Sequence, residues 1–355
     1  MKKCESLCNI VAVGHHPETF SAHSGMLPLV QTLSAGYIPY SISWEQLQKR
    51  SWTFGYLLRR WGQYYYGSEW NALVPWVDEY RFLCRLKCVS PSVLHFLWAE
   101  FASPRKDQKF RKKSGVLVGT FHCSARRQVQ VLGHFRCFHV YDLVTVVSAT
   151  QVDFLVSRGV PSDRIRVVPH GVDTSYFRPG DRTQQEDGKL RFLLVGRTER
   201  DHAFASKLMQ ALKNKPVILN VVSAPDYSHF YQGLDNVILS PFLRDEELLR
   251  CYQTADLMVM PMLDCTFNNA VMESMACGTP VMTNRVGGVP EYVDETCNYV
   301  FDNKNLDEWV DVIHSIQSNP ATLFARRPLV RQAAEKFDWG RIAPVYRQVY
   351  NDCMA

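Results

Sequence analysis

The stretch Asp264–Val293 reads DCTFNNAVMESMACGTPVMTNRVGGVPEYV and decides how the rest of the chain is interpreted. It predicts a loop, a short helix ended by Gly278, a buried strand from Thr279 to Thr283, and then a glycine pair. The N-terminus of a helix has free N–H groups that attract anions. Glu273 is expected near that N-terminus, where its carboxylate oxygens suit a vicinal diol. The stretch therefore predicts a site that holds a ribose and a diphosphate together.

Length and composition point to a globular protein of two domains. The chain has 355 residues, of which 46% are hydrophobic and 21% charged, and this length is long for a single core. The net charge of +5, from 40 basic and 35 acidic residues, suits an anionic substrate or a membrane surface. It is far from the basic stripe of a nucleic-acid-binding protein, so no nucleic-acid partner is expected.

The eleven cysteines include no C-x-x-C pair, and many lie in apolar runs. We expect reduced, mostly buried thiols, as in a cytoplasmic protein. No His–Cys set completes a zinc site, so no metal is expected. The sequence also lacks a run of about twenty apolar residues that could span a bilayer.

Contact with the inner face of a membrane remains open as an alternative. Aromatic and basic residues are interleaved between Trp44 and Trp70, as they are in helices that lie at a membrane interface. A helix that packs its aromatic residues inward has the same composition, and that interpretation is favoured.

Short apolar runs alternate with amphipathic ones, which is typical of parallel sheets covered by helices. A polar stretch at 178–188 separates two such series and predicts an interdomain linker. The expected strands are Cys8–Gly14, Ser92–Trp98, Gly115–Phe121, Asp142–Val147 and Arg164–Val168, then Leu190–Gly196, Pro216–Val222, Asn236–Leu239, Asp256–Met260, Thr279–Thr283 and Asn298–Phe301. The expected helices are Ser24–Ala35, Trp44–Tyr66, Ser124–Cys137, Asp201–Lys213, Asp245–Gln253, Asn269–Cys277 and Phe337–Tyr350.

Neither series opens with the G-x-G-x-x-G fingerprint of nicotinamide-binding domains, which argues against an oxidoreductase. The first strand of the second series instead ends in Gly196 and Arg197, and an arginine there offers a fixed cation to a phosphate. The chain also has no D-x-D triplet that could hold a metal. Without a metal site, the groups expected to hold a diphosphate are Arg197, the helix that begins near Asn268 and the glycine turn at 287–288.

The segment Asp264–Val293 closely resembles the nucleotide-sugar site of the family 4 retaining glycosyltransferases. The run Thr145–Pro179, with PHGVD at Pro169–Asp173, resembles the end of the family's first domain. The resemblance implies the GT-B fold, an α/β architecture in which two Rossmann-like, doubly wound domains face a cleft. It divides the chain into an acceptor domain at 1–178, a nucleotide-sugar domain at 189–336 and, at 337–355, a helix that crosses back to the first domain.

The family's motif carries two glutamates eight positions apart, and the second of them matches Glu273, which implies a ribose-binding role. The first is replaced by Cys265, whose thiol is a poor acceptor for sugar hydroxyls, so Asp264 or Asn268 would have to substitute for it. The family also has an arginine followed five positions later by a lysine. Arg197 matches the arginine, whereas His202 stands at the lysine position and carries charge only below its pKa.

On the remaining matched positions, the resemblance implies that His122 lies close to the donor sugar and that Gly25 belongs to a glycine loop near the diphosphate. His95 and Glu100 follow a strand and can shape the acceptor pocket. The catalytic residues expected are His122, Arg197 and Glu273. The donor-binding residues expected are Gly25, Arg197, His202, Phe242, Leu243, Asp264, Cys265, Phe267, Asn268, Asn269, Ala270 and Glu273.

The function implied is transfer of a sugar from a nucleoside diphosphate sugar to an acceptor hydroxyl, with retention of configuration and without a metal or other cofactor. The acceptor is expected to be a glycan, a lipid-linked group or a small molecule. The alternative is a non-catalytic subunit with the same fold that binds nucleotide sugar, which the replacement of a motif glutamate by Cys265 motivates. The sequence leaves the base, the sugar and the oligomeric state open.

Overall fold

In the computed structural model the chain forms two compact α/β units. The first contains the described residues up to His170, except His23–Gly25, together with those from Gly340 onward. The second contains Gly171–Trp339 and also takes in His23–Gly25. The structure describes residues 10–15, 23–40, 91–101, 115–132, 137–181, 188–241 and 243–354. The helix expected at Trp44–Tyr66 lies outside the described residues.

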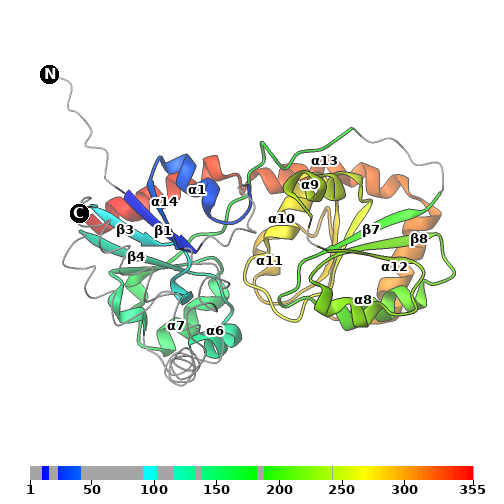
Figure 1. Cartoon of the computed structure of the whole chain (residues 1–355), viewed down its shortest axis with the longest axis horizontal. Coiled ribbons are helices and arrows are strands. Elements are labelled where there is room, and N and C mark those ends of the chain that lie inside the picture. The colour runs from blue at the N-terminus through cyan, green and yellow to red at the C-terminus, as the bar shows by residue number, and fades with distance from the viewer. Residues whose placement is uncertain are drawn as a thin grey trace, which may run out of the picture. The chain divides into compact units, whose positions relative to one another are not determined.

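The first unit is built on a parallel sheet whose strand order is β2-β1-β3-β4-β5-β6 (Figure 1). Its edge strand β2 was not expected from the sequence, because GYIPY contains a proline that cannot donate to a ladder hydrogen bond. An edge strand tolerates this, since only one side of it is paired. The strands are β1 Ile10–His15, β2 Gly36–Tyr40, β3 Val93–Phe96, β4 Val116–Phe121, β5 Leu143–Val146 and β6 Ile165–Val167.

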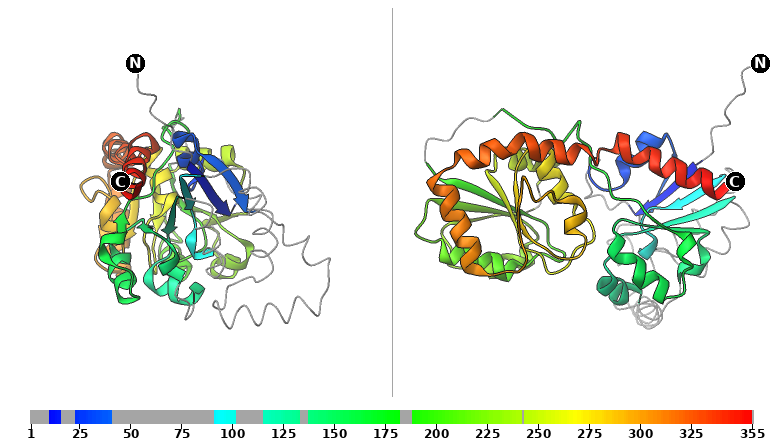
Figure 2. Two further views of the ribbon diagram at one scale, coloured as in Figure 1. Left: turned by 90° about the vertical axis from the view of Figure 1, so that its left-hand side faces the viewer. Right: turned by 180° about the vertical axis from the view of Figure 1, so that it is seen from behind.

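Helices α1 (Leu27–Leu33), α6 (Ala125–Leu132) and α7 (Val152–Ser157) accompany this sheet. The late helix α14 (Trp339–Met354) also packs in the first unit from Gly340 onward, and it lies alongside α1 and β1 (Figures 1 and 2). The hydroxyl of Tyr350 lies 2.7 Å from Nδ1 of the buried His95 in β3. The return of the last helix to the first half of the chain is therefore fixed by buried polar contacts.

The second unit has a parallel sheet of order β12-β11-β10-β7-β8-β9. Every strand expected in this half is present, with ends that shift by one or two residues. One example is β11, which begins at Val281 rather than Thr279 because Pro280 has no N–H to donate. The strands are β7 Leu190–Val195, β8 Val217–Val222, β9 Val237–Ser240, β10 Leu257–Met260, β11 Val281–Asn284 and β12 Tyr299–Phe301.

Side chains of this sheet alternate between two cores, as the period of two along a strand requires. Leu193 and Met258 point into one core and Phe192 and Leu257 into the other. Helices α8 and α12 cover the second face, and α9, α10 and α13 the first (Figure 1). The helices are α8 His202–Ala211, α9 Asp245–Thr254, α10 Asn269–Ala276, α11 Val289–Tyr292, α12 Leu306–Ser318 and α13 Ala321–Glu335.

The strand order reverses between β7 and β10, which are neighbours in the sheet although two strands, β8 and β9, lie between them in the sequence. In open α/β sheets ligands bind beyond the carboxyl ends of the strands at such a switch point. The loops that follow β7 and β10 are therefore the elements that a ligand of this unit would contact.

Candidate functional site

The loop after β7 is a tight turn with two residues in the left-handed region. Gly196 has φ of +98° and Glu199 has φ of +60°. Arg197 is exposed at the apex of the turn, where the sequence expects a phosphate-binding cation. The backbone then returns toward the sheet at Arg200, so the two arginines of the loop lie in different environments.

This loop is bonded to the loop after β10. Arg200 and Met262 form an antiparallel bridge, the N–H of Leu263 donates to the carbonyl of Glu199 at 2.9 Å, and the N–H of Asp201 donates to the carbonyl of Pro261 at 2.8 Å. The segments that carry Arg197 and Asp264 are thus parts of one continuous hydrogen-bonded rim.

Helix α10 begins at this rim. Asn268 is its N-cap, and the side-chain Oδ1 accepts from the N–H of Val271 at 3.3 Å, as N-cap asparagines do. Oδ1 also accepts from Nη2 of Arg200 at 3.1 Å. Asn269 at the first turn is half-buried, and the helix is buried from Ala270 to Ala276.

Glu273 lies on α10 as its fifth residue, one turn beyond the helix N-terminus near which the sequence placed it. Its side chain is only 5% exposed. One carboxylate oxygen accepts from the hydroxyl of Tyr252 at 2.8 Å and the other from Ser24 at 2.5 Å. Burial raises the pKa of Glu273, although the hydrogen bonds from Ser24 and Tyr252 oppose that shift. The result is a preorganised hydrogen-bond acceptor whose oxygens already hold hydroxyl groups.

Cys265, at the position of the missing glutamate, is a buried thiol whose Sγ lies 3.1 Å from the hydroxyl of Tyr292. Burial raises its pKa to about 11, so the thiol is neutral near pH 7 and suits packing rather than nucleophilic attack. Asp264 is half-buried, and its Oδ1 accepts from the N–H of Cys265 at 2.8 Å. Phe267 packs its ring 4.5 Å from that of Tyr292.

The glycine pair after β11 supports the same loop. A Cβ on Gly287, whose φ is +52°, would lie 1.9 Å from the carbonyl oxygen of Cys265. The N–H of Gly288 donates to that carbonyl at 2.9 Å. The glycine turn therefore contributes to the site by letting two backbone segments touch.

His202 lies in a different environment from Arg197. It is 2% exposed, its Nδ1 lies 2.8 Å from the hydroxyl of Tyr231, and its ring stacks on Tyr227 at 4.4 Å. Burial lowers its pKa to about 4, so the imidazole is neutral near pH 7. The structure places this residue in the packing between α8 and the 3₁₀ segment Pro225–Tyr231.

In the first unit, His122 directly follows β4 and belongs to a compact polar cluster. Its ring stacks on Trp98 with centroids 5.6 Å apart, and its Nδ1 lies 3.9 Å from Oε2 of Glu100. Oε1 of the buried Glu100 accepts from the backbone N–H groups of His122 and Cys123. Burial raises the pKa of Glu100, but these hydrogen bonds and the adjacent imidazole outweigh it and hold the pKa below its ordinary value.

The other expected donor-binding residues lie as follows. Gly25 has φ of +69° and follows Ser24, whose hydroxyl is bonded to Glu273. Leu243 packs against the core that contains Tyr252 and α10, and Phe242 lies outside the described residues. The structure therefore brings Arg197, Asp264–Ala270 and Glu273 onto adjacent elements of the second unit, whereas His122 belongs to the first unit.

Three residues of this site were missed from the sequence. Arg200, Tyr252 and Tyr292 each contact a predicted residue, namely Asn268, Glu273 and Cys265. Only Arg200 had a signal in the sequence, since it lies in the same turn as Arg197. The two tyrosines come from helices whose role at the site appears only in the tertiary structure.

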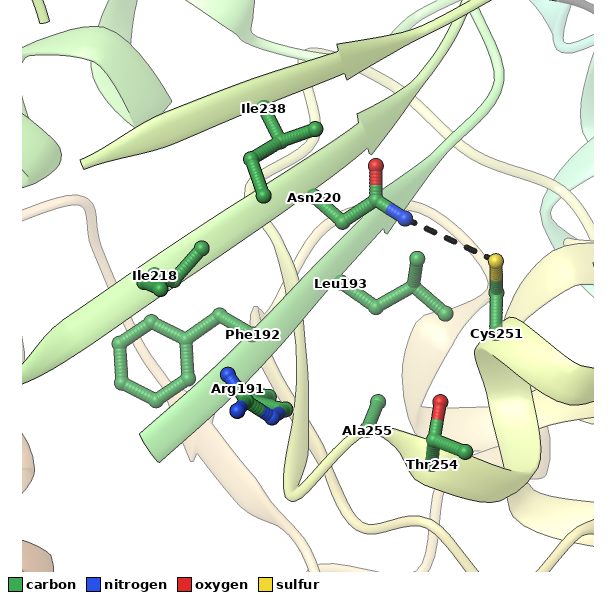
Figure 3. A pocket seen from close by; sticks show the side chains of 9 residues that line it. All are labelled: Arg191, Phe192, Leu193, Ile218, Asn220, Ile238, Cys251, Thr254 and Ala255. Atoms are coloured by element: carbon green, nitrogen blue, oxygen red, sulfur yellow. Dashed lines mark hydrogen bonds between the residues drawn. The ribbon is translucent and has the colours of Figure 1, made fainter. Parts of the chain in front are cut away.

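A hollow of about 170 Å³ lies elsewhere, against the face of β7, β8 and β9 (Figure 3). Ile218, Ile238 and Leu193 point into it, and Asn220 donates to Sγ of Cys251 at 3.6 Å. None of the predicted site residues lines this hollow. Its lining is mostly apolar and lacks the carboxylate and glycine turn of the loops after β7 and β10, so we place the functional site at those loops.

Within the described ranges, no cluster of three or more His, Cys, Asp or Glu side chains could hold a metal ion. In the same part of the chain, no helix is both long and apolar enough to cross a bilayer.

Comparisons with known proteins agree with this geometry. Residues 181–319 match the model of the group 1 glycosyl transferases, and residues 44–176 match the model of Glycosyltransferase Family 4. The chain is 27% identical over 228 residues to a D-inositol 3-phosphate glycosyltransferase from Paenarthrobacter aurescens, covering 58% of this chain and 56% of that protein. It is 29% identical over 233 residues to an MMP alpha-(1->4)-mannosyltransferase from Mycolicibacterium hassiacum, covering 60% and 54%. The matched region thus spans little more than half the length of these relatives.

Among solved structures, Anabaena HepE in complex with UDP and glucose superposes with a TM-score of 0.67 at 14% identity, covering 97% of this chain and 99% of that one. This likeness confirms the expected fold class, two parallel-sheet α/β domains of the GT-B type. With both halves of the chain matched by models of one enzyme family, the protein belongs to the family 4, group 1 glycosyltransferases.

Proposed function

We propose that the protein transfers a sugar from a nucleoside diphosphate sugar to an acceptor hydroxyl, with retention of anomeric configuration and without a metal ion. The observation that carries this proposal is the buried carboxylate of Glu273, which accepts hydrogen bonds from two hydroxyl groups on the helix that starts at the β7–β10 rim. An acceptor of that kind suits the 2′ and 3′ hydroxyls of a ribose. Arg197 and the N-terminus of α10 supply positive potential for the diphosphate.

In the reaction, the bond between C1 of the sugar and the β-phosphate oxygen breaks, and a bond between C1 and the acceptor oxygen forms on the same face. The proton of the acceptor hydroxyl moves to the departing phosphate. Negative charge grows on that phosphate in the transition state, so fixed cations and N–H dipoles around it lower the barrier. We assign this role to Arg197 and the loop Cys265–Asn269, and the ribose to Glu273.

The donor class is tested by calorimetry of the purified protein with UDP-, GDP-, ADP- and TDP-sugars in the presence of EDTA. Selective binding of one nucleotide supports the proposal. The UDP-sugars come first, because the HepE complex contains UDP. Absence of binding across the panel contradicts it.

Turnover is then measured with the selected donor and with inositol phosphate as the first acceptor, since the Paenarthrobacter relative is named for an inositol phosphate. The configuration at C1 of the product is read from its proton coupling in NMR. Inversion would contradict retention, and activity that EDTA abolishes and magnesium or manganese restores would contradict metal independence.

A further inference from the structure

Arg200 is a cation that has no counter-ion among the residues that the structure describes. It is half-buried, yet no carboxylate among the described residues lies within ion-pair distance of it, in contrast to Arg285, which pairs with Glu295 and Asp302. A charge withdrawn from water is ordinarily paired. An arginine that remains charged and is held without a partner at the rim of a ligand-binding edge indicates an anion that the protein binds.

The guanidinium is fixed by acceptors that carry no full charge. Nε donates to the carbonyl of Val195 at 3.1 Å, Nη1 to the carbonyl of Thr198 at 2.7 Å, and Nη2 to Oδ1 of Asn268 at 3.1 Å. A guanidinium has five N–H groups, and these bonds use three of them. Within the described part of the chain the other two have no acceptor, so both remain for a ligand.

The turn is shaped around this side chain. A Cβ on Gly196 would lie 2.7 Å from Nη2 of Arg200, so only glycine lets the guanidinium lie across the turn. The bridge between Arg200 and Met262 fixes its backbone as well. The cation therefore has little conformational freedom to lose when it binds a ligand, which is the property of a preorganised site.

His202, two residues later, cannot supply this charge. Its ring is enclosed by Tyr227 and Tyr231 and it is 2% exposed. Lys304 pairs with Asp201. Among the described residues of the segment Gly196–His202, the basic side chains that can reach an anion are therefore Arg197 and Arg200.

We propose that Arg200 binds the diphosphate of the donor through its two remaining N–H groups and acts with Arg197 as a second phosphate-binding cation. This inference rests on the proposed function, because the anion is the diphosphate of the donor. The competing explanation is a purely structural one, in which Arg200 only ties the N-cap of α10 to the turn after β7.

The test compares a nucleoside with its diphosphate for the base that the wild-type protein selects, for example uridine and UDP. Calorimetric affinities are measured for wild type, R200Q, R200K and R191Q. Arg191 serves as the matched control because it lies on β7 beside the hollow of Figure 3, away from the rim. Hydrogen bonds to a charged group predict that R200Q weakens UDP binding by about tenfold or more and leaves uridine binding unchanged. R200K should recover part of the UDP affinity, and R191Q should match wild type.

An equal loss for uridine and UDP in R200Q would assign Arg200 to the structural role and overturn the proposal, as would unchanged UDP affinity. If R200Q does not fold, the affinities of R200K for UDP and uridine serve as the test. R200K keeps the charge but not the planar fork, so a loss confined to UDP supports the proposal, whereas an equal loss for both ligands or none contradicts it. Failure of the proposed function itself is distinguishable, because the wild-type protein would then bind no nucleotide.

Discussion

The hydroxyl of Tyr252 donates a 2.8 Å hydrogen bond to the carboxylate of Glu273, and both side chains are buried. Tyr252 comes from α9 and Glu273 from α10. The bond ties two helices of one sheet face together at the group to which we assign the ribose. Stability and ligand affinity are therefore coupled at Glu273.

Glu273→Gln should weaken binding of the selected nucleoside diphosphate by about tenfold, because an amide offers one acceptor oxygen where the carboxylate offers two. The measurement is calorimetric affinity for the ribonucleotide and for its 2′,3′-dideoxy analogue. The penalty should disappear with the analogue, which has no hydroxyls to donate. A loss of the same size for both nucleotides would contradict the assignment to the ribose. Tyr252→Phe removes the hydrogen bond to Glu273 and keeps the carboxylate, so it separates the loss of that bond from the loss of the carboxylate.

The stability of the fold should depend on pH through the same residue. Because burial raises the pKa of Glu273 above the value of about 4.5 expected for the unfolded chain, its contribution to stability is fully present below that value. The contribution is lost as the pH rises through the folded-state pKa. We expect the Tm of wild type minus that of E273Q to fall as the pH rises above the unfolded-chain value of about 4.5 and to level off above the raised folded-state pKa. A difference that rises with pH would show that Glu273 is ionised more readily in the fold than outside it.

Cys265→Ser should keep turnover within about threefold of wild type, because a buried thiol with a raised pKa is not a nucleophile. The hydroxyl can still reach Tyr292, the partner of the thiol. Alkylation by iodoacetamide, followed by mass spectrometry, should leave Cys265 unmodified in the folded protein. A hundredfold loss of turnover in the serine variant, or rapid alkylation at this position, would assign it a chemical role.

Gly287→Ala should destabilise the protein far more than Gly233→Ala. Both glycines have positive φ, but the new Cβ would lie 1.9 Å from the carbonyl oxygen of Cys265 in the first case and would meet nothing within 4 Å in the second. The backbone conformation alone costs about 1–2 kcal/mol in each variant. Denaturant unfolding should give that loss for Gly233→Ala and a larger one for Gly287→Ala. Equal losses would mean that the loop after β10 adapts to the added methyl group.

The sheets could be expected from the sequence because their strands are short apolar runs with turn residues at each end. The strand β2 could not, since GYIPY has the composition of a loop and is ordered by pairing with β1 over Val11–His15. Helix α13 was not predicted from the sequence for a related reason. Pro328 lies inside it, and a proline ordinarily ends a helix.

The residues of the site also divide into those that the sequence predicts and those that it does not. Arg197 and Glu273 could be assigned because each stands in a local pattern of strand, turn and helix. The contacts that define their chemistry come from residues distant in sequence, such as Tyr252, which lies 21 positions from Glu273, and Arg200, which lies 68 positions from Asn268. Such pairings depend on how strands are ordered in the sheet, and a single sequence does not carry that information.

The placement of α14 has a consequence for how the protein is made. Residues 171–339 emerge from the ribosome as a continuous run that contains all but three residues of the second unit. Most of the first unit is synthesised earlier, but the unit is complete only when residues 340–354 have been synthesised. The contact between His95 and Tyr350 can form only after the 254 residues between them have been translated. Until then the nascent chain lacks the helix α14 that packs beside β3. The first unit, which is begun first during translation, is therefore completed last.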